Sequence, residues 1–204
     1  MPALHAFAFA ALLLAGRDDP PARAFVGARL IPIDGPEIER GVLVVRDGRI
    51  EAVGPEGEVA LPADAERIDL SGRTLMPGLV CTHSHVGEPW GADGSHPLQP
   101  EVRALDGMDV RAKSVERARA GGLTTINCMP GSGHLISGQT VYLKLRDGDT
   151  LEELAYRFED GGLMGGLKMA NGTNPQDEPP FPGTRAKSAA LVRQRFVQAQ
   201  EYRD

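Results

Sequence analysis

The sequence predicts an α/β protein: a small all-β, sandwich-like module over residues 25–75, followed by an incomplete (β/α)8 TIM barrel over residues 76–204. Apolar runs in the first part are short and show no helical period. In the second part strand and helix patterns alternate, an order typical of a parallel sheet or barrel. The 25 glycines and 16 prolines also favour short elements joined by turns. A complete barrel takes eight strands and about 250 residues, so the second part holds about the first four strands.

The β module begins with a strand pattern at residues 25–33 (FVGARLIPI). Two further runs, VLVVR and RIEAV, flank Asp47-Gly48, which is a strong signal for a two-residue hairpin turn. A fourth short pattern covers residues 67–70.

The second part opens with a short apolar strand at residues 79–82, directly after Met-Pro-Gly. A capping box, Thr150 with Glu153, opens a helix expected to run to about residue 158. The other expected elements are a helix over residues 109–120 that stops at Gly121-Gly122, strands at 123–129, 140–145 and 166–170, and a helix over 186–202.

The first residues carry an apolar run, AFAFAALLLA at residues 6–15, which is too short to span a bilayer as a helix. It has the length of a signal-peptide core, and Ala22-Arg23-Ala24 offers a small-x-small cleavage pattern. We therefore expect residues 1–24 to be an export signal and the mature protein to be periplasmic or secreted, without a membrane span. A cytoplasmic protein with a buried first strand is the alternative.

The overall composition is that of a soluble globular protein, with 41% hydrophobic and 25% charged residues. A formal net charge of −6 argues against a nucleic acid partner, because phosphate binding needs a basic face. The two cysteines, Cys81 and Cys128, lie in apolar runs where a free thiol usually packs as a small core residue. The sequence leaves open whether the two cysteines form a disulfide.

The candidate metal ligands are His83 and His85. Side chains two apart on a strand share a face, and these two stand at the strand's carboxyl end, where parallel barrels place their active sites. Neutral imidazole is a common ligand of zinc and similar metals. A bare His-x-His also arises by chance as a turn, but its place between Met-Pro-Gly and the α/β units favours a site for a divalent metal. Zinc is expected first, with manganese, cobalt and iron open.

At this point the sequence resembles a known family. LMPGLVCTHSHVG (residues 75–87) resembles the opening strand of the amidohydrolase superfamily, and the β module resembles the one that precedes it there. AGGLTTI (residues 120–126) resembles the passage into the second strand of these enzymes. PGSGHLISGQ (residues 130–139) resembles the imidazolonepropionase- and prolidase-like branch. The resemblance covers nearly everything from Phe25 to the end and implies the N-terminal part of a metal-dependent hydrolase.

The resemblance also implies a third ligand. In related enzymes a lysine at the end of the fourth strand is carboxylated by carbon dioxide and bridges two metal ions, and Lys168 in GLKMA matches that position in the order of strands. The alternative is an ordinary lysine extending from a strand end, and some members use one ion and no modified lysine. His134, in the loop after the second strand, is a candidate substrate-binding residue, with a plain loop role as its alternative.

The implied function is hydrolysis of C–N bonds in amides, cyclic amides or small peptides by a metal-activated water acting on a small-molecule substrate. The resemblance places the catalytic carboxylate and two further histidines beyond Asp204. No catalytic residue is therefore expected in this chain, which we expect to be inactive alone. Hydrolysis of C–O or P–O esters on the same scaffold stays open, as does a non-catalytic binding protein of the same fold. So does a homo-oligomer of the full-length protein.

Overall fold

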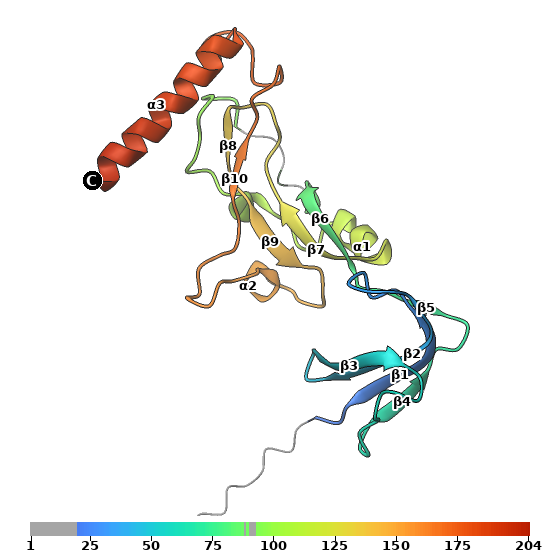
Figure 1. Ribbon diagram of the computed structural model, residues 1–204. Helices are drawn as coiled ribbons and strands as arrows, with labels where there is room; N and C mark the ends of the chain where they lie inside the picture. Colours follow the sequence, from blue (N-terminus) through green and yellow to red (C-terminus); the bar gives the residue numbers. More distant parts are fainter. Residues whose placement is uncertain (1–19, 88, 90–92) are drawn as a thin grey trace, which may run out of the picture. The chain divides into compact units, whose positions relative to one another are not determined.

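The computed structural model describes residues 20–87, 89 and 93–204. The chain forms two compact units, Met1–Pro77 and Gly78–Asp204 (Figure 1). Its secondary structure is α/β, with many short strands and few helices. The apolar run of the expected export signal, residues 6–15, lies outside the described residues. No helix in the described part combines the length and the apolar character that a bilayer span requires.

The first unit is a single sheet in the order β3-β2-β1-β4, with β5 also paired to β1. Strands β1, β2 and β3 are antiparallel neighbours, whereas β4 and β5 run parallel to β1. Its strands are β1 (Arg23–Leu30), β2 (Ile38–Arg46), β3 (Arg49–Pro55), β4 (Glu66–Asp69) and β5 (Thr74–Leu75). The described residues up to Pro77 contain strands and no helix.

The hairpin between β2 and β3 forms at the expected turn. Asp47 has φ of 47° and Gly48 has φ of 69°. A type I′ turn needs positive φ at both central positions, which asparagine, aspartate and glycine adopt at least cost. The sequence pair Asp-Gly therefore fixes the register of this hairpin.

The start of β1 differs from the expectation. The boundary between signal and β module was expected after Ala24, but β1 already begins at Arg23. Ala22 and Ala24 are fully buried in a small cluster with Val42 and Val44. Their small apolar side chains suit a packed sheet face as well as a cleavage pattern, and cleavage after Ala24 would remove residues from this core.

The second unit contains two small sheets, ordered β6-β7-β9 and β10-β8. Among the named strands of the described residues, β6 and β7 form the one parallel pair of this unit; β9 runs antiparallel to β7, and β10 runs antiparallel to β8. Its elements are β6 (Leu79–Ser84), η1 (Ala104–Gly107), α1 (Lys113–Ala120), β7 (Leu123–Cys128), β8 (Ile136–Gln139), β9 (Val141–Lys144), α2 (Leu151–Leu154), β10 (Leu167–Met169) and α3 (Arg185–Arg203).

The antiparallel pairs correct the expectation of a purely parallel order. A parallel return needs a crossover of a dozen or more residues, usually a helix. No helix stands between β7 and β9, so the chain turns back and β9 pairs beside β7 in the opposite direction. Strand β8 is not predicted by the sequence pattern, because ISGQ carries only one apolar side chain.

Two helices are shorter than expected. Helix α1 begins at Lys113 instead of residue 109, because the Asp109 carboxylate accepts a hydrogen bond from the Arg111 amide in a preceding turn. The capping box of α2 is present as expected, but the helix ends after Leu154. Ala155 then pairs with Leu143 as an isolated bridge, and this pairing takes the backbone out of the helix.

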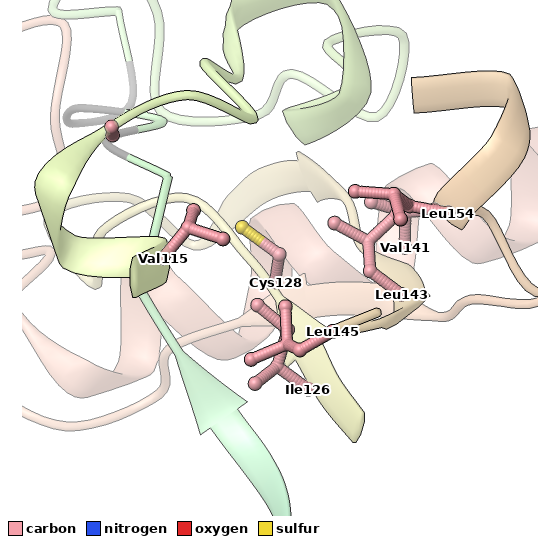
Figure 2. Packing of buried hydrophobic residues seen from close by; sticks show 8 residues of the cluster. Val115, Ile126, Cys128, Val141, Leu143, Leu145 and Leu154 are labelled. Carbon is pink, nitrogen blue, oxygen red and sulfur yellow. The ribbon is translucent and has the colours of Figure 1, made fainter. Parts of the chain in front are cut away.

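The main core of the second unit lies between the β6-β7-β9 sheet and the two shorter helices, α1 and α2. Figure 2 shows Val115 of α1 and Leu154 of α2 gathered with side chains of β7 and β9. Its buried members are Ala112, Val115, Ile126, Cys128, Val141, Leu143, Leu145 and Leu154. Cys81 of β6, the strand whose carboxyl end carries the candidate histidines, packs against this core.

Candidate metal centre

A β-bulge orients the histidine segment. The pairing of β6 with β7 shifts register between Cys81 and Ser84. Cys81 packs against the main core, whereas His83 lies beside Lys168. Two residues that are two apart in a regular strand would share a face, so the bulge is what sends them to different surroundings. Bulges of this kind commonly re-aim side chains next to active sites.

His83 and His85 converge as their spacing predicts. Their ring centroids are 5.3 Å apart with an interplanar angle of 81°. The Nδ1 atom of His85 is 2.8 Å from the carbonyl oxygen of Met129, which follows β7. A carbonyl can only accept, so Nδ1 carries the proton and Nε2 of the neutral ring keeps its lone pair. Histidine ligands are usually oriented in this way by a carbonyl or carboxylate on the other ring nitrogen.

The structure brings Lys168 to the same place. Its Nζ atom lies 3.3 Å from Nε2 of His83. The side chain comes from β10 and exposes only 9% of its surface. Lys168 therefore does not extend freely into solvent, as an ordinary strand-end lysine would.

The electrostatics favour neutral nitrogens. The positive charge of Lys168 lowers the pKa of His83, and burial and His85 add to the lowering. Burial also lowers the pKa of Lys168, because it disfavours the ammonium form. Both changes increase the share of uncharged nitrogen near neutral pH. An uncharged imidazole binds a metal, and an uncharged amine reacts with carbon dioxide.

These residues fit a divalent ion as part of a ligand set. Two imidazoles with an oriented Nε2 suit zinc or a similar ion. An ammonium group has no lone pair to offer, whereas a carbamate on Lys168 would supply anionic oxygen. No group of three or more histidine, cysteine, aspartate or glutamate side chains that could hold a metal occurs among the described residues. Zinc takes four ligands in most structural sites and three protein ligands plus water in catalytic ones, so these residues supply part of a site.

His134 lies apart from this group, in the loop before β8. It exposes 6% of its surface, and its ring meets Phe181 edge-on with centroids 5.1 Å apart. Neither ring nitrogen has a hydrogen-bond partner among the described residues. Burial lowers the pKa of His134, and the backbone of Asp93 and then its charge oppose that change. The structure shows no contact of His134 with His83, His85 or Lys168, so its substrate-binding role stays a prediction.

Two contributors to the site were not identified from the sequence. The Met129 carbonyl could not be identified from the sequence, because a backbone group carries no residue-specific signal. Asn127 did carry such a signal, because it is a polar side chain within the otherwise apolar end of β7. Its Nδ2 atom donates a hydrogen bond to the carbonyl oxygen of Thr82 at 3.3 Å. Both cysteines are free thiols, so the disulfide left open by the sequence is not formed.

Comparisons with known proteins agree with the resemblance seen in the motifs. An imidazolonepropionase from Bradyrhizobium sp. is 42% identical over 86 residues, which are 42% of this chain and 19% of that protein. A dihydroorotase from Anaplasma phagocytophilum is 30% identical over 206 residues, covering 93% of this chain and 41% of that protein. No family model matches.

A solved structure is similar over most of the chain. The crystal structure of an amidohydrolase from Thermotoga maritima MSB8 has a TM-score of 0.77 and 33% sequence identity, and the match covers 88% of this chain and 48% of that one. The chain thus spans less than half the length of each of these three proteins. The sequence relatives, this structural likeness and the converging histidines lead to one conclusion: the chain belongs to the amidohydrolase superfamily.

Proposed function

We propose that this chain carries part of the active site of a metal-dependent hydrolase of C–N bonds in amides, cyclic amides or peptide-like small molecules. The observation that carries the proposal is the meeting of two imidazoles and one buried amine: His83 and His85 have ring centroids 5.3 Å apart, and Lys168 is 3.3 Å from His83. The relatives named imidazolonepropionase and dihydroorotase support the reaction class, since both hydrolyse C–N bonds.

The roles follow from the geometry of each residue. His83 and His85 would hold a divalent ion through Nε2, and the Met129 carbonyl keeps the His85 ring in the tautomer that this requires. When bound, such an ion lowers the pKa of a coordinated water and polarises the carbonyl that is attacked. Zinc is the ion proposed, because imidazole nitrogen is among its preferred ligands.

Lys168 is proposed to enter the ligand set as a carbamate. Its neutral amine would attack carbon dioxide, forming one N–C bond and releasing one proton, and the product carries an anionic oxygen. The 3.3 Å separation from His83 places Nζ close enough for that group to share an ion with the imidazole. One or two ions would then be held.

The architecture proposed for the whole protein is a TIM barrel preceded by a β-sandwich module, of which this chain supplies about the first four barrel strands. The general base and the remaining ligands are proposed to lie on a part of the protein outside these 204 residues. The similar structures and relatives are about twice as long or longer, which supports this arrangement. Export by a leader at residues 1–24 and a homo-oligomeric full-length protein stay predictions.

A metal titration of the 204-residue chain tests the proposal. We expect weak but saturable Zn²⁺ binding, measured by competition with a chromophoric chelator. His83→Ala and His85→Ala should each weaken it at least about tenfold, because each removes a ligand. His96→Ala is the matched control, since His96 is exposed and its Nδ1 contacts only the backbone of Leu98. Equal affinities for the wild type and the two site variants would overturn the proposal.

A further inference from the structure

Side chains, in addition to strand pairing, hold the backbone of the histidine segment. Three carbonyl groups within residues 82–86 accept hydrogen bonds from side chains: Asn127 Nδ2 to Thr82 at 3.3 Å, Cys81 Sγ to His83 at 3.1 Å and Cys128 Sγ to Val86 at 3.2 Å. The thiols of both cysteines in the chain therefore bond to the segment that carries the candidate ligands.

The bulge explains why these bonds are needed. Residues in a β-bulge leave the regular ladder, and a backbone carbonyl that loses its strand partner needs another donor. Among the described strands β6 also has only one neighbour, β7. The carbonyls at Thr82 and His83 lie within the shifted stretch between Cys81 and Ser84, where the ladder does not supply donors regularly.

Asn127 occupies its position at an energetic cost. Its Oδ1 atom is buried and has no hydrogen-bond partner among the described residues. An unsatisfied buried acceptor costs about 1–3 kcal/mol. Replacing the side chain with an apolar one of similar size would remove that cost, so stability alone does not explain an asparagine here. Its donor group, by contrast, contacts the residue immediately before His83.

We infer that Asn127, Cys81 and Cys128 are positioning residues of the candidate metal centre. They fix the backbone of residues 82–86, and the fixed backbone keeps the rings of His83 and His85 in their edge-to-face arrangement in the absence of metal. Preorganisation of this kind raises affinity because less freedom is lost on binding. The inference rests on the proposed function, since it concerns the same two ligands.

Two pairs of variants separate positioning from packing. Cys81→Ala removes the donor, whereas Cys81→Ser keeps a donor with a similarly small side chain. Asn127→Leu removes both the donor and the unsatisfied acceptor and keeps the number and branching of the side chain's heavy atoms. Thr125→Val is its control, because Thr125 lies two residues earlier on the same face of β7 and makes no side-chain hydrogen bond to the histidine segment in the described structure.

Two readouts are measured on each folded variant. The first is Zn²⁺ affinity, by chelator competition. The second is ¹⁵N chemical shift of the His85 ring in the metal-free chain, which reports whether Nδ1 keeps its proton or the two tautomers mix. Thermal unfolding of each variant identifies any that does not fold, and Cys81→Ser, the mildest change, keeps the test available in that case.

We expect Asn127→Leu and Cys81→Ala to weaken Zn²⁺ binding about tenfold and to give mixed His85 tautomers, with the melting temperature of Asn127→Leu unchanged or raised. Cys81→Ser and Thr125→Val should behave as the wild type. The inference would be overturned if Asn127→Leu and Cys81→Ala bound Zn²⁺ with the wild-type affinity and kept a single His85 tautomer. If His83→Ala and His85→Ala leave Zn²⁺ affinity unchanged, the proposed function fails instead, and the tautomer readout still decides whether the segment is held.

Discussion

Lys168 and His83 are 85 positions apart in the chain, yet Nζ of one lies 3.3 Å from Nε2 of the other. The contact joins β10 to the end of β6 and brings the only lysine of the candidate site against an imidazole. Two positively chargeable groups at this distance disfavour each other's charged forms. The lowered pKa of His83 is the consequence, with the charge of Lys168 as its largest cause.

Carboxylation of Lys168 is the first prediction. With ¹³C-bicarbonate and Zn²⁺ present, the chain should show one additional carbonyl ¹³C signal, because burial lowers the pKa of Lys168 and leaves more neutral amine. Lys168→Met should lose the signal, whereas Lys144→Met should keep it, since Lys144 lies over the ring of Tyr156 instead. A signal that survives in Lys168→Met would assign the carbamate elsewhere.

Gly138 should be needed to place Lys168. The two residues are paired partners in the β8–β10 sheet. Gly138 has φ of 126°, and an added Cβ would meet the Val102 carbonyl oxygen at 2.4 Å. Gly138→Ala should therefore cost about 1–3 kcal/mol of unfolding free energy in urea titrations and weaken Zn²⁺ binding through the displaced lysine.

Gly133→Ala is the control for that prediction, because a Cβ there would meet nothing within 4 Å. The midpoint urea concentration for unfolding of Gly133→Ala should equal that of the wild type. Equal stability of the two glycine variants would contradict the close approach of β8 to Val102.

His134 should make stability depend on pH. Burial is the main cause that lowers its pKa in the folded chain, so the unfolded chain binds the proton more readily. Its contribution is present above the ordinary histidine value of about 6.5 and is lost as the pH falls through the lower folded value. His134→Leu should therefore lose less unfolding free energy than the wild type between about pH 8 and about pH 5.

Urea unfolding at several pH values measures that difference. Asp93 partly opposes the effect, so Asp93→Asn should enlarge it. Parallel curves for wild type and His134→Leu across this range would show that the ring is solvated, contrary to its burial.

The two thiols should differ in reactivity. Burial raises the pKa of Cys128 to about 11, and the side chain is fully buried, whereas Cys81 is partly exposed. Because the thiolate is the nucleophile, iodoacetamide at about pH 8 should label Cys81 alone in the native chain and both residues in urea. Peptide mass spectrometry identifies the labelled site. Native Cys81→Ser should take up no label, and labelling of Cys128 there would contradict the packing of the main core.

Much of the fold follows from local sequence. Asp47-Gly48 fixed the β2–β3 hairpin, Thr150 and Glu153 formed the capping box of α2, and Gly121-Gly122 ended α1. These signals act over a few residues, where backbone preference and side-chain capping decide the outcome. The His-x-His spacing likewise predicted two neighbouring rings, as the 5.3 Å centroid distance confirms.

The strand directions and the surroundings of the site depend on long-range contacts. The antiparallel direction of β9 depends on pairing between segments that local patterns do not relate. The bulge in β6 gives Cys81 and His83 different surroundings, and the Met129 carbonyl and Lys168 reach the imidazoles only through folding. The groups that can hold a metal are readable from the amino-acid sequence, because metal binding is set by side-chain chemistry. Their meeting is a property of long-range contacts, whose energy no local stretch of the chain contains.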